Sequence, residues 1–336
     1  MAQKHILMIA TGGTIACRKT DGGLAPALRA DELLHYVPAL GEVCRVSAVQ
    51  PFSIDSTNMT PAHWQTLSRL IEENYGAYDG FVICHGTDTL AYTAAALSYM
   101  VQRSEKPIVL TGAQKPIDMD STDARVNLLD SFVYACDDAS RDVSIVFDGK
   151  AIVGTRAKKE RAKSYNAFGS INFPYPAVLQ DGRVIRYLPT RPYKADDVRF
   201  YHALEPGVCV LKLTPGAQPA LLGYLFEHYA CIVIESFGVG GIPAPLVEEF
   251  YRQMARYEGR RTVVMTTQVA HEGSNMSVYE VGKRIKQDFG LIEAYDMTLE
   301  AVITKMMWIL GQGVRGHDEV EALFHTCINH DILFTQ

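Results

Sequence analysis

The stretch HGTDTL, residues 85–90, decides how the rest of the chain is interpreted. The run before it, residues 79–84, is apolar behind a turn signal, which predicts a strand buried in a sheet. The run after it, residues 91–97, is rich in helix formers. The motif is therefore expected where a strand ends and a helix begins, which is the edge at which ligands bind in open α/β sheets.

Two interpretations of Gly86, Thr87 and Asp88 are open at this point. A helix N-terminus offers free N–H groups and a partial positive charge, and here it also carries a hydroxyl and a carboxylate. An Asp or Thr N-cap on an ordinary helix explains the same residues without any ligand. Taken alone, the motif favours the N-cap, but a second stretch of the same kind exists.

That second stretch is TGGTIA, residues 11–16, which follows the apolar run of residues 6–10. Its paired glycines remove two side chains, so the backbone can approach a ligand closely. The turn would present Thr14, and Thr14 and Thr87 at two strand ends of one sheet can converge on one pocket. A threonine hydroxyl is a weak nucleophile unless a base accepts its proton.

Two further segments carry polar groups that a site could use. Asp55, Ser56 and Thr57 lie in a third strand-end loop, which is either part of the site or a polar loop without a ligand. Residues 150–173 carry six Lys and Arg side chains. Such a cluster is usually a solvated face, and the sharper alternative is one lysine buried beside a carboxylate.

Strand and helix patterns alternate from residue 5 to about residue 148, and this predicts an α/β fold. We expect a larger N-terminal domain, residues 1–188, with a doubly wound, mostly parallel sheet. Residues 189–206 have no clear period and are expected to be a linker. The apolar and helical runs that follow predict a smaller C-terminal α/β domain at residues 207–336.

Composition limits the functional classes for this chain of 336 residues. The net charge is −6 and no long basic run exists, which argues against nucleic acid as a partner. No apolar run is long enough to span a bilayer, and no secretory signal is recognisable. Seven scattered cysteines without a C-x-x-C pair fit a reducing cytoplasm and argue against a zinc site. We expect a cytoplasmic protein with no metal, cofactor or membrane partner.

The two motifs, in this order and at this separation, resemble the two signature motifs of the bacterial-type asparaginase family. The likeness covers nearly the whole chain, including SFGVG at residues 236–240 and DMTLEA at residues 296–301. Because no signal peptide is recognisable, the chain is most similar to the cytosolic, type I branch.

The resemblance implies hydrolysis of L-asparagine to L-aspartate and ammonia. Thr14 then matches the family nucleophile, and Thr87 and Asp88 match the threonine and aspartate of the second motif. Counting back from Phe168, which resembles a family phenylalanine, places the family lysine at Lys159. Its neighbour in the sequence, Lys158, is the alternative.

The resemblance also implies how the substrate is held and how the chain assembles. Residues 55–57 match the segment that holds the amino-acid end of the substrate. The Gly86 N–H and Ser56 would bind the carboxylate and Asp88 the ammonium, and Ala113 matches a small residue beside the side-chain amide. Family sites lie at a contact between subunits, so a homodimer or homotetramer is expected.

Two positions depart from the family pattern. Many members carry a tyrosine in the lid loop, but residues 17–30 contain none, and Leu24 stands about where it is expected. Residues 17–30 are therefore either a lid of another kind or a plain connector. Many members also have an asparagine after the Gly-Val-Gly of the second domain, where this chain has Gly241.

Other functions remain open on the sequence. One methylene separates asparagine from glutamine and is worth only about 1–3 kcal/mol, so a glutaminase-asparaginase of broader specificity is the first alternative. A component of the archaeal tRNA-dependent amidotransferase and a catalytically silent amino-acid-binding module are the others. A nucleotide-binding domain is disfavoured because G-x-G-x-x-G and P-loop patterns are absent. His85 is expected to be structural, with its ring bonded locally.

Overall fold

The computed structural model describes residues 3–20, 23–190 and 192–333 of the chain. Contacts divide the chain into two compact units, residues 1–202 and residues 203–336, so the division lies inside the expected linker. Each unit is built on its own sheet, with the larger, mostly parallel sheet in the first unit. The predicted fold class, two α/β units of unequal size, is confirmed.

The first unit contains an eight-stranded sheet with the order β13-β12-β9-β8-β7-β5-β1-β4. Neighbours from β4 to β8 are parallel, and β9, β12 and β13 extend the sheet as antiparallel strands. The central strand β1 is apolar at nearly every position, as expected for a strand covered on both faces. The bounds are β1 His5–Ala10, β4 Arg45–Val49, β5 Gly80–Cys84, β7 Ile108–Thr111, β8 Val143–Phe147, β9 Lys150–Val153, β12 Ala177–Gln180 and β13 Arg183–Arg186.

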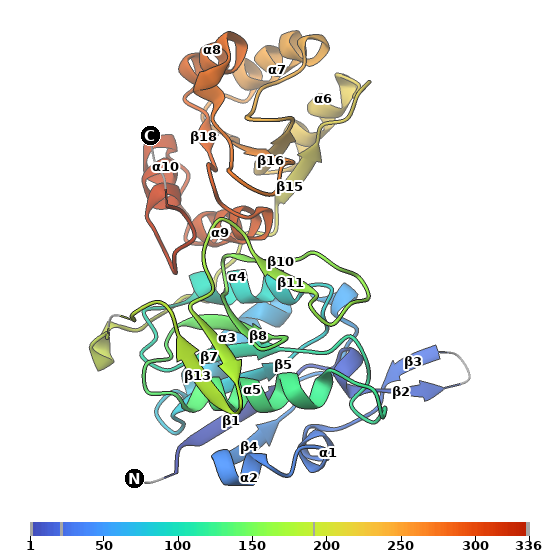
Figure 1. Cartoon of the computed structure of the whole chain (residues 1–336). Coiled ribbons are helices and arrows are strands. Elements are labelled where there is room, and N and C mark those ends of the chain that lie inside the picture. The colour runs from blue at the N-terminus through green and yellow to red at the C-terminus, as the bar shows by residue number, and fades with distance from the viewer. Residues whose placement is uncertain (1–2, 21–22, 191, 334–336) are drawn as a thin grey trace. The chain divides into compact units, whose positions relative to one another are not determined.

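Helices cover both faces of this sheet (Figure 1). One core cluster joins α1, α2 and α5 to alternate residues of the strands, such as Ile6 and Met8 of β1. The cluster contains no residue of α4, which packs against β7 and β8 and is backed by α3. The helices are α1 Ala30–His35, α2 Leu40–Val43, α3 Pro61–Asn74, α4 Leu90–Met100 and α5 Ala124–Cys136.

The second unit contains a parallel four-stranded sheet with the order β15-β16-β17-β18. Its core joins the apolar faces of α6 and α7 to β16, with Phe226 and Phe250 in edge contact at 6.3 Å between ring centroids. The elements are β15 Val208–Lys212, α6 Ala220–His228, β16 Cys231–Ser236, α7 Ala244–Arg256, β17 Thr262–Thr267, α8 Glu280–Phe289, β18 Ile292–Glu293, α9 Leu299–Gly311 and α10 His317–His325. None of the helices in the described ranges is long and apolar enough to cross a membrane.

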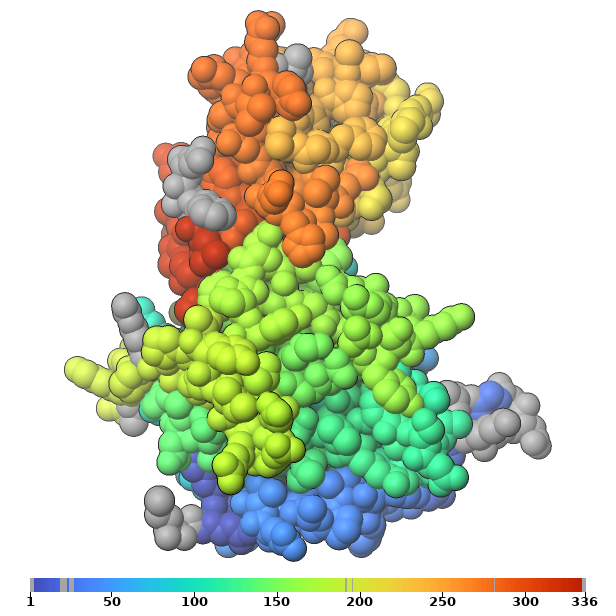
Figure 2. Space-filling view, viewed as in Figure 1, coloured from blue at the N-terminus to red at the C-terminus, as the bar shows by residue number. Residues whose placement is uncertain are grey.

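Two hairpins stand where the sequence has polar, charged segments. The segment at residues 17–30 forms strands β2 (Cys17–Thr20) and β3 (Gly23–Pro26), which pair antiparallel. The basic stretch after β9 forms β10 (Ala157–Lys159) and β11 (Phe168–Ser170), also antiparallel. This second hairpin lies at the surface of the first unit, drawn in green in Figure 2.

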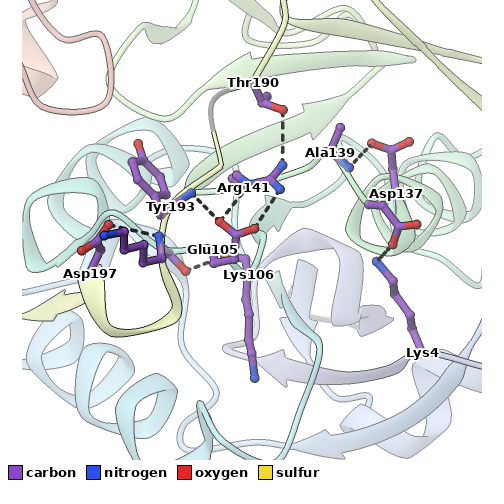
Figure 3. Close-up of polar contacts among 12 residues, drawn as sticks. Lys4, Glu105, Lys106, Asp137, Ala139, Arg141, Thr190, Tyr193 and Asp197 are labelled. Carbon is purple, nitrogen blue, oxygen red and sulfur yellow. Dashed lines mark hydrogen bonds and ion pairs between the residues drawn. The ribbon is translucent and has the colours of Figure 1, made fainter.

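The residues expected as a linker are bonded to the first unit through a set of ion pairs and hydrogen bonds (Figure 3). Arg141 makes a two-pronged ion pair with Glu105, with N···O distances of 3.0 and 2.8 Å. The Tyr193 N–H donates to the same carboxylate at 2.7 Å. Farther on, β14 (Arg199–Phe200) pairs with the short strand β6 (Val101–Gln102).

Replacing Glu105 with alanine is predicted to release this segment locally. A hydrogen bond to a charged group contributes about 1.5–3 kcal/mol, so the Tyr193 amide should exchange its hydrogen roughly 10- to 100-fold faster. Hydrogen exchange read by NMR or mass spectrometry measures this, with Glu73→Ala on the exposed side of α3 as the control. Unchanged exchange at Tyr193 in Glu105→Ala would contradict the anchoring role.

Candidate active site

The first motif forms a tight turn at the carboxyl end of β1. Gly12 and Gly13 have φ angles of +99° and +77°, which glycine adopts without strain. The Gly13 N–H donates to the Ile54 carbonyl at 3.0 Å, which joins this turn to the loop after β4. Thr14 follows as the first residue of a short 3₁₀ turn and is half-buried.

The second motif packs against the first, backbone to backbone. A Cβ atom built on Gly13 would lie 2.3 Å from the Cα of Gly86, and one built on Gly86 would lie 2.6 Å from Ser56 Oγ. Neither distance is possible for a real side chain, so both positions require glycine. The strand ends after β1, β4 and β5 therefore meet at one point, and they bring the Thr14 turn, Ser56 and Thr87 together.

Lys159 reaches this point from the hairpin at β10. Its Nζ donates to Thr87 Oγ1 at 2.7 Å and to Asp88 Oδ1 at 2.6 Å. The lysine side chain is 19% exposed and the aspartate side chain 57%, so the pair lies at the open side of the site. Successive residues of a strand point to opposite faces, so Lys158 does not share this position. The geometry therefore favours Lys159 of the two candidates, and its role in catalysis stays a prediction.

The loop after β4 contributes one buried residue and two exposed ones. Ser56 is 3% exposed, and its carbonyl accepts the Thr89 hydroxyl at 2.8 Å. The Asp55 carboxylate instead accepts the Thr57 N–H at 2.9 Å, as an N-cap of the short 3₁₀ turn Ser56–Asn58. Ser56 thus faces the second motif, whereas the Asp55 and Thr57 side chains are on the outer side of the loop.

The strand end after β7 supplies Ala113, which is fully buried, and a residue that the sequence analysis missed. Thr87 Oγ1 donates to Gln114 Oε1 at 3.3 Å. The Gln114 amide nitrogen donates to the Arg161 and Ser164 carbonyls at 3.3 and 3.1 Å, which orients the amide. Gln114 thereby directs the Thr87 hydroxyl. The signal available in the sequence was its place directly after Ala113 at a fourth strand end.

His85 has the structural role expected of it. The ring is fully buried, and its Nδ1 is 2.7 Å from the Gly86 carbonyl oxygen. Burial lowers the pKa of His85 to about 4, against the smaller opposing effect of that hydrogen bond. The ring is therefore neutral at physiological pH and holds the backbone of the second motif.

The two departures from the family pattern have defined backbone positions. Leu24 pairs with Lys19 in the β2–β3 hairpin, but its side chain lies outside the described part of the structure. Gly241 follows β16 with φ +130°, and a Cβ built there would meet no atom within 4 Å. Over the described ranges, no three His, Cys, Asp or Glu side chains gather as they would around a metal ion.

Gly13→Ala is predicted to disturb the meeting of the two motifs. The added methyl group would overlap the Gly86 backbone at a φ that alanine rarely adopts, so the free energy of unfolding should fall by roughly 2 kcal/mol or more. Urea denaturation measures the change. The control is Gly41→Ala, whose added methyl group meets no atom within 4 Å. Equal stability of the two variants would contradict the close approach.

His85 is predicted to make stability depend on pH. Its pKa is lower in the folded chain, about 4, than in the unfolded chain, about 6.5, so folding favours the neutral ring. The stabilisation is complete above pH 6.5 and is lost as the pH falls toward 4, by about 3 kcal/mol. Unfolding free energies of the parent chain and His85→Asn across this range test the prediction, with exposed His271→Gln as the control. The same acid dependence in His85→Asn would contradict it.

Comparisons with known proteins agree with this geometry. Residues 5–191 match the family model described as asparaginase, N-terminal, and residues 207–324 match that of the glutaminase/asparaginase C-terminal domain. The chain is 37% identical over 330 residues to an L-asparaginase of Thermococcus kodakarensis, covering 97% of this chain and 98% of that protein. The solved structure of the thermostable L-asparaginase from that organism matches with a TM-score of 0.91 at 36% identity, covering 98% of this chain and all of that one.

Two further relatives differ in their own length. L-asparaginase 1 of Escherichia coli K12 is 32% identical over 332 residues, which are 93% of each chain. A glutamyl-tRNA(Gln) amidotransferase subunit of Pyrococcus furiosus is 36% identical over 324 residues, 91% of this chain but 72% of that protein. With both domain models in order and relatives of this identity along its length, the chain belongs to the asparaginase family of amidohydrolases.

Proposed function

We propose that the chain is an L-asparaginase that hydrolyses L-asparagine to L-aspartate and ammonia through a threonine acyl-enzyme. One observation carries the proposal: Lys159 bonds both the Thr87 hydroxyl and the Asp88 carboxylate, next to the turn that presents Thr14. A hydroxyl nucleophile, a lysine and a carboxylate that orients the lysine are the groups that amide hydrolysis requires. Family membership supports the reaction class.

The surroundings suit the substrate, which is a zwitterion with a side-chain amide. Ser56 Oγ lies beside the Gly86 backbone, so a hydroxyl and an N–H donor are available for the α-carboxylate. Asp88 is the exposed anion of the site and suits the α-ammonium group. Ala113 ends in a methyl group and leaves room for the amide. Asp55 and Thr57 complete the loop that would hold the amino-acid end.

In the proposed reaction, Thr14 Oγ attacks the amide carbon, its proton passes to the departing nitrogen, and ammonia leaves. A water molecule positioned by Thr87 then attacks the ester, which releases aspartate and returns the proton to Thr14. Lys159, oriented by Asp88, relays the protons. The tetrahedral intermediates carry an oxyanion, for which the N–H groups of the two motif turns are the candidate donors.

Assembly and location belong to the same proposal. We propose a homodimer or homotetramer, in which the backbone at Gly241, open on its own chain, serves the contact that an asparagine makes in many relatives. The seven cysteines are all free, which fits a cytoplasmic protein. No metal or cofactor, nucleic acid or membrane takes part in the proposed reaction.

Thr14→Ala is predicted to reduce ammonia release from L-asparagine by at least about 10³-fold, because the variant lacks the nucleophilic oxygen. The measurement is a coupled ammonia assay on the purified chain, with L-asparagine and L-glutamine titrated in parallel. The unfolding midpoint should change little, since Thr14 is only half-buried. Thr14→Ser keeps the hydroxyl and should retain part of the rate.

Matched lysine variants locate the proton relay in the same assay. Lys159→Met should lose nearly all activity, whereas Lys158→Met should keep it. Full activity of Thr14→Ala would refute the acyl-enzyme. Comparable rates on both amides would favour the glutaminase-asparaginase alternative, and no release from either by a folded chain that binds asparagine would favour the silent binding module. A sigmoidal titration would indicate coupled sites.

A further inference from the structure

A chain of buried hydrogen bonds ends at the second motif. Trp64 Nε1 donates to Thr93 Oγ1 at 2.9 Å, Thr93 Oγ1 lies 2.9 Å from His85 Nε2, and His85 Nδ1 lies 2.7 Å from the Gly86 oxygen. Trp64 is 6% exposed, and Thr93 and His85 are fully buried. The chain joins α3 and α4 to the end of β5. None of these groups takes part in the proposed proton transfers.

The partners determine the direction of every bond in this chain. A carbonyl oxygen only accepts, so the His85 nitrogen facing Gly86 carries a hydrogen. The buried ring is neutral, so its other nitrogen is bare and accepts the Thr93 hydroxyl. An indole N–H only donates, so Thr93 Oγ1 accepts it with a lone pair. The ring is thereby held in the Nδ1–H tautomer.

This tautomer orients the peptide between Gly86 and Thr87. The described chain contains no cis peptide, so the carbonyl and N–H of one peptide unit point in opposite directions. With the Gly86 oxygen bonded to His85, the Thr87 N–H points away from the buried ring. No described residue accepts a hydrogen bond from this N–H. A carbonyl that accepts a hydrogen bond also polarises its peptide and strengthens the N–H as a donor.

We propose that His85 is a positioning residue, which holds the Gly86 carbonyl so that the Thr87 N–H faces the oxyanion formed on the amide substrate. The inference rests on the proposed amide hydrolysis. A preorganised donor aimed at developing charge acts in the transition state more than in the ground state. Loss of the His85 bond therefore lowers kcat and leaves KM nearly unchanged.

The kinetic test compares His85→Leu with His85→Asn. Leucine keeps apolar volume but removes the donor to Gly86, whereas the asparagine amide can place a donor near the position of Nδ1. We expect kcat for L-asparagine to fall by roughly 10- to 100-fold in His85→Leu, with KM within about threefold. His85→Asn should recover at least about tenfold of that loss. Thermal unfolding confirms that both variants are folded at the assay temperature.

A spectroscopic test is independent of turnover and remains readable if His85→Leu fails to fold. In the parent chain, ¹⁵N NMR of the ring should show a protonated Nδ1 and a bare Nε2 at neutral pH. With ¹⁵N-threonine labelling, the Thr87 amide should shift downfield when L-aspartate is added. In His85→Asn, which retains a donor, the Thr87 shift should persist.

Three results would overturn the inference. They are a parent ring protonated at Nε2, a Thr87 amide that does not respond to bound aspartate, and folded His85 variants with parent kcat or with KM effects alone. If the parent chain releases no ammonia, the proposed function fails. The ring tautomer and the Thr87 response to aspartate then decide whether His85 positions an anion-binding N–H.

Discussion

The close approach of Gly13 to Gly86 is the constraint on which the candidate site depends. Two strands of one parallel sheet end side by side, and their following turns touch through backbone atoms alone. Any side chain at either position would separate the turns by the width of a methyl group. Because Thr14 and Thr87 each follow one of these glycines by one residue, the same contact determines how far apart the two hydroxyls lie.

The site is organised by burial. Neutral groups hold its backbone from the buried side, where charge would be costly: His85 has its pKa lowered by burial, and Trp64 and Thr93 bond it without adding charge. The charged pair, Lys159 and Asp88, lies on the open side, where water shares the cost of charge. Rigidity and reactivity are thus supplied by different residues on opposite sides of one turn.

Much of the fold and part of the site could be predicted from sequence. The alternation of apolar and helical runs predicted both sheets because parallel strands must be buried on both faces. Placement at strand ends brought out Thr14, Ser56 and Thr87 as neighbours. Lys159 required the family resemblance, since a charge cluster in a surface hairpin carries no local mark of the one side chain that turns inward. Gln114 carried no such mark either.

By itself, the sequence determined which segments are strands and helices, where glycine is required, and which strand ends carry hydroxyl and carboxylate groups, because these properties depend on local pattern and backbone sterics. Only the tertiary structure decided which side chains meet. The bonds of Lys159 to Thr87 and of Trp64 to Thr93 join residues separated by 72 and 29 positions. Such contacts follow from strand order and helix packing, which no short stretch of sequence specifies.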